Sequence, residues 1–299
     1  MPPTQSHLIR AILLVCVAVS LFPFMNAAAK LLAPDYPLIQ IIWARFAGHL
    51  ALAMLLFLPT RGWRLFATTR PRLQVARSTA QFFSHVAFVC GLVHVPLATA
   101  SAIGFSAPFV VTALSVPVLG ERVGWRRWTA VIVGFGGVMF IIRPGAPGEL
   151  WAMLLILLSA LFYASYQVLT RKVAPHDDAI TSILWMPLIG AVLLTAVVPA
   201  YFVLPRSLLD WLLFLSIGSI GGISHYMLVW ALRQAQVSIL APLAYMELLT
   251  VVALGYFVFG NFPDPLTWIG LAIIVACGLY IGYRETARAR QAALAGRRP

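Results

Sequence analysis

Long apolar runs constrain this chain more than any other feature. The 299 residues include repeated apolar stretches near 20 residues long, of which residues 8–30 form the first. A helix rising 1.5 Å per residue needs about 20 such residues to cross roughly 30 Å of hydrocarbon. Only 10% of the residues are charged and 61% are hydrophobic, whereas soluble domains carry about 25% charged residues. The sequence therefore predicts an all-α integral membrane protein.

Polar, proline and glycine breaks divide the apolar runs into ten expected transmembrane helices. The first five cover residues 8–30, 37–58, 73–93, 97–118 and 127–143. The second five cover residues 150–171, 179–202, 209–231, 238–259 and 266–283.

The distribution of basic residues predicts the orientation of these helices. With a cytoplasmic N-terminus, 17 of the 21 Lys and Arg residues fall on the cytoplasmic side. Lys30, Arg143 and Arg206 fall outside, and Arg45 lies within a span. Cytoplasmic loops of membrane proteins carry such an excess of Lys and Arg. Both termini are therefore expected in the cytoplasm, with the chain in a bacterial inner membrane as a multi-pass protein.

The two halves of the chain repeat each other at a shift of about 140 residues. The shift places Lys30 near Arg171, Gly120 on Gly260 and Trp128 on Trp268, and it superimposes the helix pattern. Because each half contains an odd number of spans, the halves must cross the membrane in opposite senses. Inverted repeats of this kind are typical of alternating-access transporters, with the substrate site near mid-membrane. We expect repeats at residues 1–145 and 146–286, followed by a basic cytoplasmic tail at residues 287–299.

Motifs near the end of the first repeat resemble a known family. They are Leu119-Gly120-Glu121-Arg122-Val123, Arg127-Trp128, Gly134, Gly136-Gly137-Val138 and Arg143-Pro144. These residues resemble the EamA repeat of the drug/metabolite transporter superfamily. In the second repeat, Phe259-Gly260-Asn261 replaces the Leu-Gly-Glu pattern. The resemblance implies a secondary transporter, and within the superfamily the chain looks most similar to exporters of aromatic and neutral amino acids.

Two charged residues lie deep within expected spans. Arg45 lies roughly 12 Å into the second span, and Glu247 lies roughly 15 Å into the ninth from the other side. A charge near mid-membrane costs roughly 2.5 to 3.5 kcal/mol on insertion scales, so such residues usually face a cavity or a partner. Glu247 could bind a substrate amine or a proton, with Arg45 as the partner of a carboxylate. The alternative is a structural ion pair between the two.

Other polar and aromatic residues within the spans are candidates for the lining of a cavity. His49 follows Arg45 by one helical turn, and Gln81 and His85 share a face in the same way. The remaining candidates carry rings with a polar edge, which suit a zwitterion with an apolar or aromatic side chain. These candidates are Trp43, Tyr163, Tyr166, Trp185, His225, Tyr226 and Tyr245. Pro108 and Pro242 interrupt the fourth and ninth spans and are expected hinges.

The main hypothesis is a secondary transporter that exports amino acids or similar small metabolites. A carrier for a nucleoside-containing cofactor, a sugar or a drug would share these features. Neither a nucleophile with a base nor a metal-ligand spacing is found, which argues against an enzyme and against a resident cofactor or metal. Charge rings of a channel and Walker motifs are also missing from the sequence. The basic residues suit anionic lipid rather than nucleic acid, and the expected architecture is compatible with a monomer.

Overall fold

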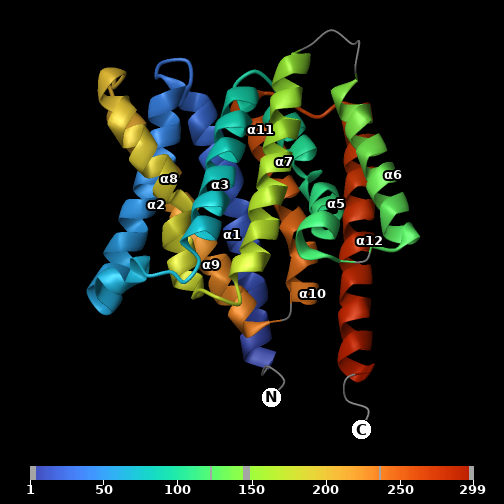
Figure 1. Cartoon of the computed structure of the whole chain (residues 1–299). Helices are drawn as coiled ribbons and strands as arrows, with labels where there is room; N and C mark the ends of the chain where they lie inside the picture. Colours follow the sequence, from blue (N-terminus) through green and yellow to red (C-terminus); the bar gives the residue numbers. More distant parts are fainter. Residues whose placement is uncertain (1–4, 122, 144–148, 236, 296–299) are drawn as a thin grey trace.

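The chain folds into a bundle of helices. The computed structural model describes residues 5–121, 123–143, 149–235 and 237–295, and every element in these ranges is helical (Figure 1). The first half contains α1 (Gln5–Leu32), α2 (Leu38–Arg61), η1 (Gly62–Phe66), α3 (Pro71–Leu92), α4 (Leu97–Gly104), α5 (Ala107–Leu119) and α6 (Trp125–Ile142). The second half contains α7 (Leu150–Val173), α8 (Ala179–Val197), η2 (Val198–Ala200), α9 (Leu208–Gln234), α10 (Val237–Leu240), η3 (Ala241–Met246), α11 (Glu247–Phe259) and α12 (Pro265–Ala295).

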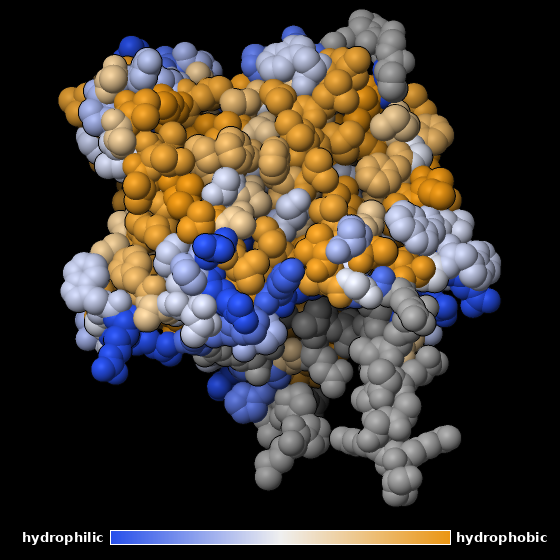
Figure 2. Space-filling view, viewed as in Figure 1, coloured by the Kyte–Doolittle hydropathy of each residue, from blue (hydrophilic) through white to orange (hydrophobic). Residues whose placement is uncertain are grey.

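The surface of the bundle has the pattern of a membrane protein. Nine segments of the described chain are long and apolar enough to cross a membrane, and a broad apolar band faces outward in Figure 2. The remaining predicted span, the third in chain order, is α3. It is less apolar than the other nine because it carries Gln74, Arg77, Gln81 and His85. The start of α1 and the end of α12 lie at the same end of the bundle, called the terminal end below, as an even number of spans requires (Figure 1). Its cytoplasmic location stays a prediction from the charge distribution.

Helix boundaries differ from the prediction mainly in the fourth and ninth spans. Each was expected as one helix, but the fourth is divided into α4 and α5, and the ninth into α10, η3 and α11. Pro108 lies in the first turn of α5 and Pro242 in the first turn of η3. A proline there removes no helical hydrogen bond. Pro108 therefore lies just after the interruption of the fourth span, and Pro242 lies at the start of the η3 interruption of the ninth.

The terminal residues also differ in part from the expectation. Residues predicted as a tail from position 287 continue α12 as far as Ala295, while residues 296–299 lie outside the described chain. Of the basic residues used to predict orientation, Arg122, Arg297 and Arg298 lie outside it too.

Equivalent helices of the two halves make equivalent contacts. Helix α1 packs along α9 as α3 packs along α7, and α6 packs along α12. The α6–α12 contact joins two glycines: a Cβ on Gly137 would lie 2.9 Å from the Gly270 carbonyl oxygen, and one on Gly270 would lie 2.5 Å from the Gly137 oxygen. Gly120 and Gly260, paired by the sequence repeat, end α5 and α11 with left-handed φ angles of 70° and 66°. The structure thus confirms two repeats of the same design.

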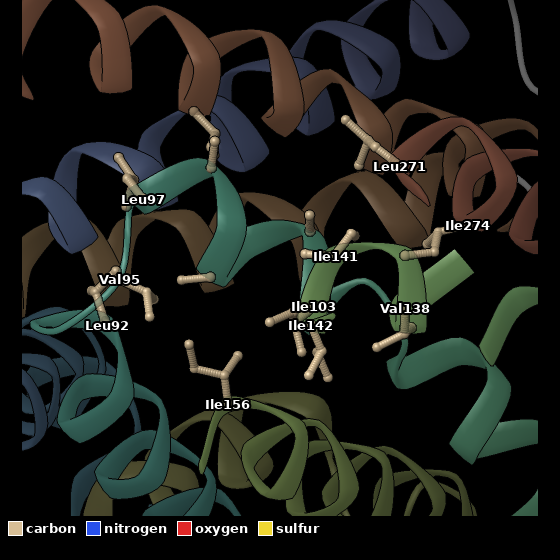
Figure 3. Close-up of a cluster of buried hydrophobic side chains, with 14 of the residues drawn as sticks. Leu92, Val95, Leu97, Ile103, Val138, Ile141, Ile142, Ile156, Leu271 and Ile274 are labelled. Atoms are coloured by element: carbon tan, nitrogen blue, oxygen red, sulfur yellow. The ribbon is translucent and has the colours of Figure 1, made fainter. Parts of the chain in front are cut away.

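A continuous apolar core forms beside the interrupted fourth span. Ile103 of α4 packs with Ile141 and Ile142 of α6 and with Ile156 of α7 (Figure 3). Leu271 and Ile274 of α12 complete this core from the second repeat. Helices α5 and α6 also approach closely here. Gly134 of α6 allows this contact, because a Cβ at this position would lie 2.3 Å from the ring of Phe109 on α5. The core therefore holds α6 and α12 as a scaffold behind the interrupted helix.

Candidate functional site

A close crossing of α2 and α9 brings two predicted site residues together. Gly48 and Gly218 meet at the crossing, where a Cβ on either would lie within 2.8 Å of the other's Cα. The rings of His49 and His225 consequently lie 5.5 Å apart between centroids. Nδ1 of His225 is 2.8 Å from the Gly221 carbonyl oxygen, whereas the buried Nε2 of His49 has no hydrogen-bond partner among the described residues.

Arg45 lies one turn before His49 on α2 and is only 6% exposed. Its Nη1 contacts the sulfur of Met25 on α1. His85, Tyr163 and Tyr166 lie within electrostatic range of the guanidinium. Among the described residues no ion pair joins Arg45 to Glu247, so the structure does not form the structural ion pair considered from the sequence. The guanidinium is thus a buried cation that has no carboxylate partner within the described part of the chain.

Two tyrosines on α7 form a stacked pair beside Arg45. The rings of Tyr163 and Tyr166 lie 5.8 Å apart with an interplanar angle of 19°. Tyr166 donates a hydrogen bond to the sulfur of Met186, 3.3 Å away. Tyr163 remains 38% exposed although it lies within electrostatic range of both Arg45 and Glu247. Because these charged neighbours lie on α2 and α11, the exposed ring faces the interior between the repeats rather than the lipid.

Glu247 is the first residue of α11, immediately after the η3 interruption. The positive end of a helix dipole favours a carboxylate at this position. The side chain is half-buried, and within the described chain it makes no hydrogen bond or ion pair. Tyr163 lies within electrostatic range of it. The interruption therefore places a carboxylate with unused hydrogen-bonding capacity opposite the tyrosine pair.

Helix α3 presents a polar face toward this region. Arg77, Gln81 and His85 follow one another at intervals of four residues. The His85 ring packs edge-on against Phe46 at 5.5 Å, and the buried Oε1 of Gln81 has no partner among the described residues. Arg77 lies over the Tyr166 ring at 5.1 Å and donates to the Gln74 side chain and the Ser182 carbonyl, each at 2.7 Å. Arg77 was predicted from the charge distribution only as a cation of the cytoplasmic side, but its side chain is buried and extends this polar face.

Four of the predicted cavity residues lie elsewhere. Trp43 donates to Thr195 of α8 at 2.9 Å, and Trp185 donates to the Phe66 carbonyl at 3.2 Å. Tyr226 packs against Phe57 at 5.6 Å, away from its neighbour His225. Tyr245 stacks on Phe105 at 5.3 Å, and its hydroxyl occupies the notch left by Gly278. The first three therefore brace helix pairs, while Tyr245 links the interruptions of the fourth and ninth spans.

Polar contacts join the two repeats at each end of the bundle. At the terminal end, Asp177 accepts from the Thr68 hydroxyl, from the Thr69 N–H at 3.1 Å and from Gln74 at 2.8 Å, while Asp178 pairs with Arg61. We call these contacts the terminal clamp. Burial alone raises the pKa of Asp177, but the hydrogen bonds from Thr68, Gln74 and Thr69 outweigh it and lower the pKa below its ordinary value.

The opposite end carries a corresponding set, called the opposite clamp. Tyr36 donates to Asp210 at 2.8 Å, and Gln40 exchanges two 2.8 Å hydrogen bonds with the backbone of Val203. Arg206 pairs with Asp35 at 3.7 Å. Each clamp joins the loop after the first helix of one repeat to the loop after the second helix of the other. The two ends are therefore closed by related contacts.

The fold and these contacts define a class of protein. Two inverted repeats, interrupted helices in equivalent positions and polar groups buried between the repeats are the features of a secondary membrane transporter. No group of three or more His, Cys, Asp or Glu side chains suited to a metal occurs in the described residues. The EamA-like transporter family matches residues 9–143 and 150–282, one match for each repeat. The chain belongs to this family and is a transporter rather than an enzyme.

Characterised relatives carry several kinds of metabolite. The chain is 29% identical over 235 residues to an S-adenosylmethionine uptake transporter of Rickettsia bellii, covering 79% of this chain and 80% of the relative. It is 31% identical over 251 residues to a riboflavin transporter of Rhizobium johnstonii, covering 82% of each. A pseudopaline exporter of Pseudomonas aeruginosa is 27% identical over 268 residues, or 89% of this chain and 94% of the relative.

A solved crystal structure shares the fold, with a TM-score of 0.65 and 19% identity over 91% of this chain and 96% of that one. The resemblance to the family is thus confirmed, whereas the expectation of amino-acid export finds no support among the named relatives. They favour the alternative, a carrier of another metabolite class such as a nucleoside-containing cofactor.

Proposed function

We propose that the chain carries a cationic, nucleoside-containing metabolite of the S-adenosylmethionine class across the bacterial inner membrane. The observation that supports this choice is Glu247, a half-buried carboxylate at a helix N-terminus with no ion pair in the described chain. A sulfonium or ammonium group is the natural partner for such a carboxylate. The stacked Tyr163 and Tyr166 offer rings for a purine and a face for a cation.

Arg45 fits the other end of such a substrate. A guanidinium binds a carboxylate with two parallel hydrogen bonds, and Arg45 has no carboxylate partner among the described residues. Tyr163 interacts electrostatically with both Arg45 and Glu247, so both charges lie near its ring. A substrate with an amino-acid end, a positive charge and an aromatic base would use all three groups.

Riboflavin is the second candidate, because the Rhizobium johnstonii relative reaches 31% identity over 82% of the chain. Its flavin ring can stack on tyrosine, but it carries no permanent charge to pair with Glu247 or Arg45. The two candidates therefore differ in their need for these side chains. Removal of the Glu247 charge should abolish transport of a cationic substrate and leave flavin transport nearly unchanged.

Counterflow in proteoliposomes tests the proposal. Vesicles loaded with unlabelled compound are given labelled S-adenosylmethionine, riboflavin or phenylalanine. We expect accumulation of S-adenosylmethionine, lowered at least tenfold by Glu247→Gln, since a charge-assisted contact contributes about 1.5–3 kcal/mol. Glu149→Gln, an exposed carboxylate before α7, is the matched control and should retain wild-type transport. Accumulation of riboflavin or phenylalanine alone would contradict the proposal.

A further inference from the structure

A groove between α6 and α12 lies outside the region assigned to transport. It has a volume of about 370 Å³ and is lined by Trp125, Arg126, Thr129, Ala130, Val133, Cys277 and Tyr280. The lining residues of α6 follow a helical spacing, and so do Cys277 and Tyr280 of α12. Trp125, Arg126, Thr129 and Val133 are exposed, so the groove opens at the surface of the bundle, which within the expected spans faces the membrane.

The groove is amphipathic along its length. Its deeper part is apolar, with Ala130, Val133 and Cys277 within the spans of α6 and α12. Arg126, in the first turn of α6, is the charged residue among those that line it, and its guanidinium lies over the Trp125 ring at 5.3 Å. Arg284 lies one turn beyond Tyr280 on the same face of α12. Basic residues thus mark the terminal end of the groove, and apolar residues its interior.

This arrangement matches one molecule of the surrounding membrane. A phospholipid has an anionic phosphate at the headgroup level and acyl chains below it. Arginine is well suited to phosphate because its planar fork donates two parallel hydrogen bonds. Trp125 is 72% exposed, which suits an amphipathic ring at the boundary between headgroups and hydrocarbon. We propose that the groove is a binding site for an anionic phospholipid, with Arg126 at the phosphate and an acyl chain between α6 and α12.

Such a site would bear on the transporter as a whole. Helices α6 and α12 form the scaffold on which the interrupted fourth span rests, since Ile141 of α6 and Ile274 of α12 belong to the same core (Figure 3). A lipid between these helices would fill a gap in their contact without entering the space between the repeats. Its expected effect is therefore on stability, with the substrate preference of the transporter unchanged.

Native mass spectrometry of the intact, detergent-purified protein tests the site directly. The probes are phosphatidylglycerol, which is anionic, and phosphatidylcholine, which is zwitterionic. We expect retained phosphatidylglycerol at lower lipid concentration than phosphatidylcholine. Arg126→Gln should weaken phosphatidylglycerol about fivefold, since one basic residue contributes about 1 kcal/mol near an anionic lipid. Arg64→Gln is the control, because Arg64 is exposed in η1 at the same end of the bundle.

A second variant fills the groove without changing charge. Val133 is 49% exposed, so Val133→Trp should fold normally while occupying the space of the acyl chain. We expect it to lower retention of both lipids and Arg126→Gln to lower only the anionic one. In a variant with Cys16 and Cys90 replaced by serine, bound phosphatidylglycerol should slow maleimide labelling of Cys277. Equal retention of the two lipids, unchanged binding by both variants, or a dimer that covers Cys277 would overturn the proposal.

Discussion

Arg77, Gln81 and His85 form a buried polar face on α3, and Arg77 joins this helix to α8 through the Ser182 carbonyl. The spacing of Gln81 and His85 indicated a shared polar face, and the same interval reaches back to Arg77. Arg77 also fits the pattern of a basic residue at the cytoplasmic side, so its place on the buried polar face of α3 was not predicted. Met25, which contacts Arg45, gave no comparable signal, because a methionine in an apolar run has the sequence pattern of packing.

Arg77 is expected to be important for stability. Arg77→Ala leaves the Gln74 side chain and the Ser182 carbonyl without their donor, and each bond to a charged group contributes about 1.5–3 kcal/mol. The variant should therefore melt well below the wild type in detergent. Arg72→Ala changes an exposed residue of the same helix and should melt like the wild type. A similar loss of melting temperature in both variants would show that the hydrogen bonds of Arg77 add no particular stability.

Asp264, which lies outside the membrane-spanning segments, should make the stability of the fold depend on pH. Burial alone raises its pKa, but the hydrogen bonds from Thr267 and the contact with Arg143 lower it to about 2. A lowered pKa stabilises the fold above the ordinary value near 4, and this contribution is lost as pH falls toward 2. The wild type should lose more melting temperature than Asp264→Asn between about pH 5 and about pH 2.5. Parallel loss in the two proteins would show that Asp264 contributes no such stability.

At the scale of the elements, the sequence predicted all ten spans and indicated bends in the fourth and ninth, but it did not predict the division of these two spans into separate helices. Pro108 and Pro242 lie in the first turn of α5 and of η3, and their role as hinges stays a prediction. Their exact effect could not be predicted, because a proline fits equally well inside a kinked helix and in the first turn of a new one. Which case holds depends on tertiary packing, here the stack of Phe105 on Tyr245 across the two interruptions.

The contact between these interruptions can be tested by a double-mutant cycle. A Cβ added at Gly278 would lie 1.8 Å from the Tyr245 hydroxyl oxygen, so Gly278→Ala should displace the ring from Phe105 and slow transport. Tyr245→Phe removes the colliding atom, and the double variant should recover much of the lost rate. Gly136→Ala is the control, because its Cβ would meet nothing within 4 Å. Additive losses in the double variant would exclude this contact as the cause.

For the whole molecule, the inverted repeat could be predicted from the number of spans. The residues that lie between the repeats could be predicted only in part. Arg45, His49, Tyr163, Tyr166, His225 and Glu247 were predicted from polarity at mid-span depth, and the structure gathers them. Trp43, Trp185 and Tyr226 also lie within expected spans but make their contacts elsewhere, with Thr195, Phe66 and Phe57. The depth of a residue follows from its position along the helix. Which face of the helix points inward depends on the rotation of the helix, and a span that is apolar on all sides does not reveal this rotation in its sequence.

The terminal and opposite clamps predict how the molecule must move. In alternating access each end opens once per cycle, so each clamp must separate for substrate to pass. Cysteine pairs at Arg61 and Asp178 or at Asp35 and Arg206 should therefore block transport when bridged by a reducible cross-linker, and reductant should restore it. A pair at Arg143 and Asp264 is the control, because these residues join α6 to the α11–α12 loop beside the glycine contact of the scaffold. Bridging this pair should leave transport nearly unchanged. Continued transport with both clamps bridged would show that the pathway does not run between the repeats.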